Sequence, residues 1–357
     1  MKKVLLALLV LGVLAAAIAG AWYLRRERRI SEFAATPVTL PSEGVTLAVP
    51  GGTGPRTIAR MLADAGVVTD PGLLYLYIRR ERVGTRLKAG EYLFEGTLTP
   101  AQVVEQLASG RVKLYRFTVP EGLRVEEILP LLAGSELKLD LEELKRLASD
   151  PGFPREAGVP AASLEGFLYP DTYAFTRGAT AEEVLKKMVE RALEEYRKAD
   201  AQRKDGVKLS LLETFTLASI VEKETGQPQE RPRISCVFHN RLRQGIKLET
   251  DPTVLYAMKL LRGVYSRNIT RKDLRTPHPY NTYTTPGLPP GPIASPGAAA
   301  LQAALHPLDC DDLFFVSRND GTHIFCPTLE CHETAVRKWQ VEFFREKRRR
   351  QRMNGTP

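Results

Sequence analysis

Hydrophobic positions form one long unbroken run at the start of the chain and shorter periodic runs afterwards. From Val4 to Leu24 nearly every residue is apolar and none is charged. At about 1.5 Å of rise per residue, a helix of this length crosses a hydrocarbon layer of about 30 Å. The run predicts a membrane anchor over residues 1–24, with a cytoplasmic amino terminus. A cleaved signal peptide is the alternative, because the alanines between residues 15 and 19 would suit a small-residue cleavage site.

Behind this run, glycine and proline separate short elements. Residues 25–44 begin with arginines, continue with Pro37 and Pro41, and are expected to form a linker. Over 45–112 the pattern predicts a strand, two helices, a second strand and a third helix. Strand, helix, helix, strand is the order of LysM-type glycan-binding modules, which this stretch resembles loosely. Glycan binding and a structural spacer both stay open for it.

Longer periodic helices alternate with short strands over residues 113–346, which are expected to form one larger domain. A capping-box signature precedes an amphipathic helix over 181–199. Two strands flank Asn319-Asp320-Gly321, a sequence typical of a tight hairpin. Residues 347–357 are expected to be a basic tail. The mixture of elements indicates the α+β fold class.

One helix, expected from about Lys208 through Glu224, has apolar residues around nearly its whole circumference. Such a helix is usually buried inside a domain. A carboxyl group at its end, Glu222 or Glu224, can keep its proton near neutral pH, as a general acid for glycosidic cleavage must. Solvated helix-end charges are the alternative. At about 100° per residue the two glutamates point roughly 200° apart, and periodicity does not choose between them.

Charge and cysteine content restrict the classes of partner. Lys and Arg number 51 against 42 Asp and Glu, and the excess gathers at 25–29 and 345–352. The first cluster reads as a membrane flank, and the second is expected to be solvated. Aromatic and basic residues are not interleaved in the way single-stranded nucleic acid requires, so nucleic acid is not expected as a partner.

The cysteines allow disulfides in an exported domain. They are Cys236, Cys310, Cys326 and Cys331. The near pairs are Cys326 with Cys331 and Cys310 with Cys326. His323 and His332 add metal-ligand types, but the spacing matches no standard zinc pattern, so neither a metal nor another cofactor is expected.

Four ordered blocks of the sequence are recognisable as a set. They are Leu164–Phe175, Ala218–Thr225, Val237–Leu242 with Leu248–Val254, and Tyr280–Pro296. Together they closely resemble the endolytic murein transglycosylases, the YceG-like family, and the resemblance covers nearly the whole chain. It implies a single-pass protein of the bacterial inner membrane whose catalytic domain is periplasmic or extracytoplasmic. Positive-inside counting alone would instead put the arginines at 25–29 in the cytoplasm.

The resemblance also implies the chemistry. The second glutamate of its block, Glu224, would be the catalytic acid, with Glu222 as the fallback. The implied reaction is non-hydrolytic cleavage between N-acetylmuramic acid and N-acetylglucosamine in peptidoglycan strands, which leaves 1,6-anhydro ends and terminates glycan elongation. One carboxyl acts first as acid and then as base, so no second carboxylate is required. Glycan strands are the implied partner, and peptidoglycan synthases are further candidates.

Several residues of these blocks are expected to contact the glycan. The segment 276–296 has seven prolines in 21 residues, which would stiffen a groove wall. On it, Tyr280 and Tyr283 could stack on sugars and Asn281 could bond an acetamido group, unless the segment is only a rigid loop. The other candidates could equally cap a helix or a turn. They are Asn240, Asp251, Thr253, Tyr169 and Asp171.

Two other functions are compatible with an exported domain. A non-catalytic peptidoglycan-binding scaffold would be favoured by degenerate glutamates, yet both glutamates are present. A metal-dependent wall amidase would need a ligand spacing that the sequence lacks. The last block departs from the family pattern at Cys326 and Cys331, which leaves its local geometry open.

Overall fold

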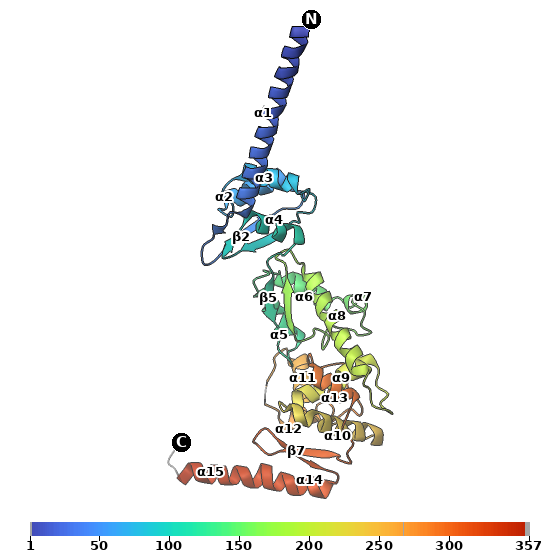
Figure 1. Cartoon of the computed structure of the whole chain (residues 1–357). Helices are drawn as coiled ribbons and strands as arrows, with labels where there is room; N and C mark the ends of the chain where they lie inside the picture. The colour runs from blue at the N-terminus through green and yellow to red at the C-terminus, as the bar shows by residue number, and fades with distance from the viewer. Residues whose placement is uncertain (1, 267, 354–357) are drawn as a thin grey trace. The chain divides into compact units, whose positions relative to one another are not determined.

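The computed structural model describes residues 2–266 and 268–353 of the chain (Figure 1). The chain divides into two compact units, Met1–Tyr115 and Arg116–Pro357. Helices are mixed with two-stranded sheets in the described part of the chain. The α+β mixture expected from the sequence is therefore confirmed. The finer domain bounds given above stay a prediction.

The first unit has its own core beneath short helices and strands. Its elements are α1 (Lys2–Ala35), β1 (Val38–Thr39), β2 (Val45–Val49), α2 (Pro55–Asp64), α3 (Pro71–Arg80), β3 (Gly90–Phe94), β4 (Thr97–Leu98) and α4 (Pro100–Ser109). Strand β2 pairs antiparallel with β3, so that Val45 lies opposite Phe94. The order strand, helix, helix, strand matches the expectation, but it does not by itself identify a LysM-type module.

Helix α1 carries the long apolar run. Its portion Leu8–Ala35 is long and apolar enough to cross a membrane, judged by length and composition alone. The helix continues past the arginines, so residues 25–35 of the expected linker are helical. Burial explains the extension, because Ile30 and Phe33 are only 1% and 8% exposed and α1 contacts α3 and α4. The helix ends at Ala35, because Pro37 disfavours helical backbone at the residue before it.

The second unit is mostly helical. From the unit boundary onward the elements are β5 (Tyr115–Thr118), α5 (Val125–Ala133), α6 (Leu141–Ser149), α7 (Phe153–Glu156), β6 (Thr172–Phe175), α8 (Ala181–Asp200), α9 (Leu211–Glu224), η1 (Pro228–Glu230), α10 (Arg231–Gln244), α11 (Asp251–Arg262), α12 (Arg271–Arg275), α13 (Ala298–Leu305), β7 (Phe314–Ser317), β8 (His323–Cys326), α14 (Leu329–Val336), η2 (Arg337–Glu342) and α15 (Phe343–Met353). The predicted helix over 181–199 corresponds to α8, which Thr180 and Glu183 cap reciprocally.

Helix α9 is the central helix of this unit. It contacts α13, α10 and α11, which lie around it in Figure 1. Its residues Thr214–Val221 are all buried, which confirms the expectation drawn from their apolar pattern. The helix begins at Leu211 rather than near Lys208, because Ser210 and Glu213 form a capping box. Both glutamates lie in the last turn of this helix, where Glu224 contacts Thr250 before α11 and Glu222 contacts Arg231 of α10.

The predicted hairpin and terminal helix are both present. Strands β7 and β8 pair antiparallel around the Asn-Asp-Gly turn, with Ser317 opposite His323. The terminal helix is longer than expected, since α14, the π-helical turn η2 and α15 follow one another without a break. Residues 347–353 of the expected tail belong to α15, and 345–351 are exposed. The remainder of the tail, 354–357, lies outside the described residues.

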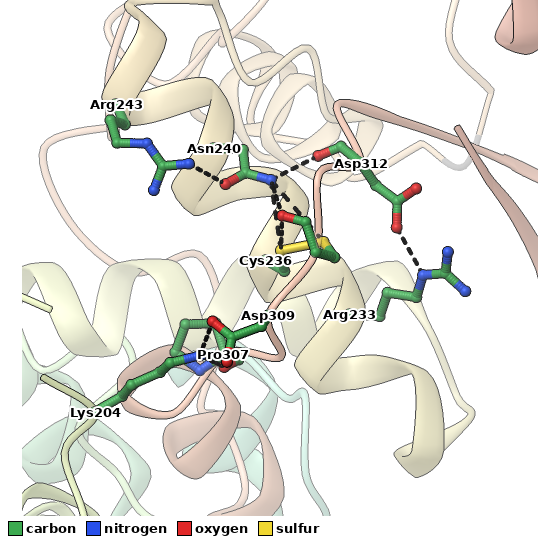
Figure 2. The surroundings of a disulfide bond; sticks show 9 residues. Lys204, Arg233, Cys236, Asn240, Arg243, Pro307, Asp309 and Asp312 are labelled. Carbon is green, nitrogen blue, oxygen red and sulfur yellow. Dashed lines mark hydrogen bonds and ion pairs between the residues drawn. A yellow bond between two sulfur atoms is a disulfide. The ribbon is translucent and has the colours of Figure 1, made fainter. Parts of the chain in front are cut away.

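Two disulfides brace this unit. Cys236–Cys310 joins α10 to the loop before β7, across 74 residues of sequence, and Figure 2 shows its surroundings. Cys326–Cys331 joins the end of β8 to α14. The near pair Cys326–Cys331 expected from spacing therefore forms. The alternative Cys310–Cys326 does not form, because Cys310 is bonded to Cys236 of α10. Spacing along the chain could not indicate this pairing of distant cysteines.

Candidate active site

Glu224 is the last residue of α9. The chain leaves the helix at Thr225, whose backbone is extended (φ −140°, ψ 136°). The Glu224 side chain is half-buried, and its Oε1 accepts a hydrogen bond from the Thr250 hydroxyl. Burial raises the pKa of Glu224 to about 7. The hydrogen bond from Thr250 lowers this pKa, and the charge of Asp251 raises it further. Near neutral pH this carboxyl can therefore both give and accept a proton.

Two other buried threonines, Thr253 and Thr282, hold Thr250 in place. Thr250 is the residue before α11, and its backbone N–H donates to the Thr282 hydroxyl at 3.1 Å. The Thr253 hydroxyl donates to the Thr250 carbonyl at 2.7 Å and lies 2.8 Å from the Thr282 hydroxyl oxygen. All three residues are at most 2% exposed. The partner of Glu224 is thus fixed by α11 and by the proline-rich segment together.

A tyrosine and an aspartate lie next to this carboxyl. The Tyr283 hydroxyl donates to Asp251 Oδ1 at 2.8 Å, and Lys247 Nζ donates to the Tyr283 carbonyl at 3.0 Å. Asp251 is exposed and Tyr283 is half-buried. The structure therefore brings three of the expected contact residues, Asp251, Thr253 and Tyr283, to the neighbourhood of Glu224.

Tyr280, on the proline-rich segment, packs against α11. Its ring packs against Tyr256 of α11 with centroids 4.9 Å apart, and it keeps partial exposure. The Tyr256 hydroxyl in turn donates to Glu165 Oε2 at 3.2 Å. Tyr280 remains a candidate for contact with the glycan, although its ring also packs against Tyr256 at an interplanar angle of 53°.

Two expected contact residues hold the protein together instead. Asn281 is fully buried, and its amide donates to the carbonyls of Asp273 and Thr276, which closes the loop on itself. Asn240 is 4% exposed, and its amide donates to the carbonyls of Cys310 and Asp312 beside the disulfide (Figure 2). Polar groups used in this way are not available to a sugar. The structure thus gives both asparagines structural roles.

Tyr169 and Asp171 are likewise engaged with α8. Asp171 accepts hydrogen bonds from Arg191 Nε and from its neighbour's N–H, each at 2.7 Å. Tyr169 is 5% exposed, with the Arg191 guanidinium 5.5 Å from its ring centroid. The ion pair lowers the pKa of Asp171 against the effect of its partial burial. These contacts fix β6 to α8, and the structure gives no support to a glycan contact at either residue.

Glu222 points to the other side of α9 and is held in a buried ion pair. Its Oε1 accepts from Arg231 Nη2 at 2.7 Å and its Oε2 accepts from the Gly297 N–H at 3.1 Å. The two side chains of the pair are 6% and 7% exposed. Burial raises the pKa of Glu222. Both of its oxygens are occupied by structural partners, so the geometry favours Glu224 as the acid.

Sequence reasoning missed two residues of interest. Thr250, which bonds Glu224, lies within the third block, and its place before Asp-Pro is a helix-cap signal that could have identified it. Glu165 lies in the first block and accepts hydrogen bonds from the Val125 N–H and from Tyr256. Burial raises the pKa of Glu165 to about 7, and the side chain lines a cavity of about 560 Å³. No periodic pattern marks an isolated carboxyl of this kind.

The sequence of this chain is similar to known proteins over most of its length. The model of the YceG-like family matches residues 47–338. The chain belongs to the YceG-like family. It is 30% identical over 313 residues to an endolytic murein transglycosylase of Bacillus subtilis strain 168, covering 83% of this chain and 84% of that protein. An endolytic murein transglycosylase of Streptococcus pneumoniae strain D39 is 27% identical over 322 residues, which are 82% of this chain and 58% of that protein.

Solved structures agree with this assignment. A YceG-like protein of Listeria monocytogenes, known from a 2.6 Å crystal structure, superposes with a TM-score of 0.54 and 30% sequence identity. The match covers 82% of this chain and 99% of the Listeria chain. The resemblance to the YceG-like family is therefore confirmed, and the relatives from Bacillus subtilis and Streptococcus pneumoniae are named endolytic murein transglycosylases.

Proposed function

We propose that this YceG-like chain is a membrane-anchored lytic transglycosylase that cleaves peptidoglycan glycan strands internally with Glu224 as its catalytic group. The observation that carries the proposal is the half-buried Glu224 carboxyl, whose pKa is raised to about 7 and whose partner Thr250 is held by buried hydroxyls. The names of the two relatives support the substrate class.

Glu224 would act first as an acid. The protonated carboxyl donates to the oxygen that links N-acetylmuramic acid to N-acetylglucosamine, and the bond from that oxygen to the muramyl C1 breaks. Positive charge develops at C1 and its ring oxygen. The carboxylate of Asp251, near enough to affect the pKa of Glu224, can stabilise this charge, as can the muramyl acetamido group.

The ionised Glu224 would then act as a base. It takes the proton from the muramyl C6 hydroxyl, whose oxygen forms a bond with C1 and closes the 1,6-anhydro ring. The proton returned to Glu224 restores the starting state, and no water is consumed. Between the two steps the Thr250 hydroxyl donates to the Glu224 carboxylate. This hydrogen bond stabilises the ionised Glu224 until it takes the proton from the C6 hydroxyl.

The location and the biological outcome are part of the same proposal. Helix α1 would anchor the protein in the bacterial inner membrane, with the second unit on the extracytoplasmic side. Cleavage of nascent strands there would terminate their elongation, in company with peptidoglycan synthases. The small module of β2, α2, α3 and β3 would be a LysM-like aid to glycan binding.

Product analysis tests the proposed reaction. Purified full-length protein in detergent is incubated with glycan strands, both peptide-bearing and denuded, and the fragments are examined by mass spectrometry. We expect 1,6-anhydro-muramyl ends. Reducing ends would identify a hydrolase, released stem peptides an amidase, and intact strands a scaffold, and each of these would contradict the proposal.

The pH dependence of cleavage follows from the raised pKa of Glu224. The acid step needs the protonated carboxyl, so kcat/KM is expected to fall as pH rises through about 7. With an ordinary glutamate pKa the fall would lie between pH 4 and 5 instead. A pH–rate profile measured on uncross-linked strands distinguishes the two. A fall centred below pH 5 would contradict the role of burial at this residue.

A further inference from the structure

Glu230 connects three segments that lie far apart in the sequence. It ends η1, six residues after Glu224, and directly precedes α10. Its Oε1 accepts from the His323 backbone N–H at 2.9 Å, and its Oε2 accepts from His323 Nδ1 at 2.7 Å. The Thr225 hydroxyl also donates to Oε2, at 3.4 Å. One carboxylate thus joins the end of α9, the start of α10 and the start of β8.

Thr225 lies between this carboxylate and Glu224 along the chain and contacts Glu230. It follows Glu224 directly, is 4% exposed, and also accepts the Gln227 N–H at 3.0 Å. The last residues of a helix have carbonyls without partners inside the helix, so their orientation depends on the loop that follows. The contacts of Thr225 therefore fix the backbone that directly follows Glu224.

The β7–β8 hairpin is a firm support for this arrangement. The His323 ring packs edge-on against Phe315, with centroids 5.4 Å apart, and Phe315 packs edge-on against Phe238 of α10 at 5.9 Å. Gly321 lies close to the Gln227 side chain, since a Cβ there would be 3.2 Å from Gln227 Nε2. The Cys326–Cys331 disulfide fixes the far end of β8. The Glu230 and His323 side chains are only 16% and 11% exposed.

We propose that Glu230 and His323 form a clamp that positions Glu224 for proton transfer, so that the C-terminal hairpin is part of the catalytic apparatus. The inference rests on the proposed role of Glu224. Both clamp residues are positioning residues, because they act through Thr225 and do not touch the sugar. Loosening the clamp would let the Glu224 carboxyl turn away from Thr250 and toward water, which lowers its pKa toward the ordinary value.

A matched pair of variants tests the clamp in the full-length protein. His323→Phe keeps a ring and the backbone N–H but removes the side-chain donor to Glu230 Oε2, whereas His323→Asn keeps an N–H donor near the position of Nδ1. We expect His323→Phe to lower kcat about 10- to 100-fold with little change in KM, and His323→Asn to retain kcat within a few-fold. Of these two variants, His323→Phe alone should move the midpoint of the alkaline fall in kcat/KM below 7. Thr225→Val, which removes the hydroxyl at constant shape, should behave like His323→Phe.

Controls separate positioning from stability and from the proposed reaction. His306→Phe, at an exposed histidine outside the clamp, should leave kcat and the midpoint unchanged. The ionisation of Glu224, followed by NMR with carboxyl-labelled glutamate, should shift in His323→Phe even if the wild type makes no anhydro ends. In that case the proposed reaction is wrong and the clamp stands. An unmoved Glu224 midpoint, or equal kcat in the Phe and Asn variants, would overturn the clamp.

Discussion

Replacing Glu224 with glutamine is expected to remove strand cleavage almost completely. Glutamine keeps the size of the side chain and can still accept from Thr250, but it has no proton to give and cannot take one. General acid–base catalysis contributes about 10² to 10⁴ in rate, and here one group serves both steps. We therefore expect kcat to fall by about 10³-fold or more, measured as anhydro-muramyl ends formed per unit time.

The same variant should keep its fold and its affinity for strands. Glu224→Gln removes a carboxyl whose burial disfavours its charged form, so its thermal unfolding temperature should be equal to or above that of the wild type at pH 8. Sedimentation with insoluble peptidoglycan measures binding separately from cleavage. Full activity in Glu224→Gln together with loss in Glu222→Gln would transfer the catalytic assignment to Glu222.

The second large effect is expected on stability, at the buried pair of Glu222 and Arg231. Arg231→Met leaves the Glu222 carboxylate in a site where it is 6% exposed, with the Gly297 N–H as a remaining partner. Removing one member of a buried pair typically costs about 3–5 kcal/mol. We expect the calorimetric transition of the second unit to move to clearly lower temperature, while cleavage well below that temperature continues.

An exposed arginine provides the control for this experiment. Arg146 pairs with Glu143 on the surface of α6, where the two side chains are 63% and 43% exposed. Arg146→Met should leave the transition nearly unchanged, because exposed ion pairs contribute little. If Arg231→Met abolished cleavage by fully folded protein, Glu222 would belong to the chemistry and the structural interpretation of the pair would be wrong.

Much of the fold could be predicted from local patterns. The all-round apolar composition of α9 and the Asn-Asp-Gly turn both depend on residues close in sequence, and both expectations are confirmed. The helical state of residues 25–35 could not be predicted in this way. Turn-forming residues from Pro37 onward suggested a linker, but Ile30 and Phe33 are buried in the first unit and the helix continues to Ala35. That contact is not visible in the local sequence.

The site was harder to predict, because the role of each polar residue depends on hydrogen-bond partners that are distant in the sequence. Periodicity puts Glu222 and Glu224 on opposite sides of α9 but cannot show that the partners of Glu222 are Arg231, nine residues on, and Gly297, 75 residues on. Similarly, Asn240 and Asn281 look like binding residues until their acceptors are seen. A polar residue inside an apolar block indicates that its hydrogen bonds matter, but not whether they are made to protein or to substrate.

The Cys236–Cys310 bond has a consequence for how the protein is made. Its two cysteines are separated by α11, the proline-rich segment and α13, so the bond can close only after all of these have been synthesised. If the second unit is exported as proposed, Cys236 crosses the membrane well before Cys310, and Cys326 and Cys331 follow Cys310 closely. Recombinant production in a reducing cytosol would leave the thiols unpaired. An oxidising host compartment with a disulfide isomerase is therefore the appropriate source of correctly matured protein.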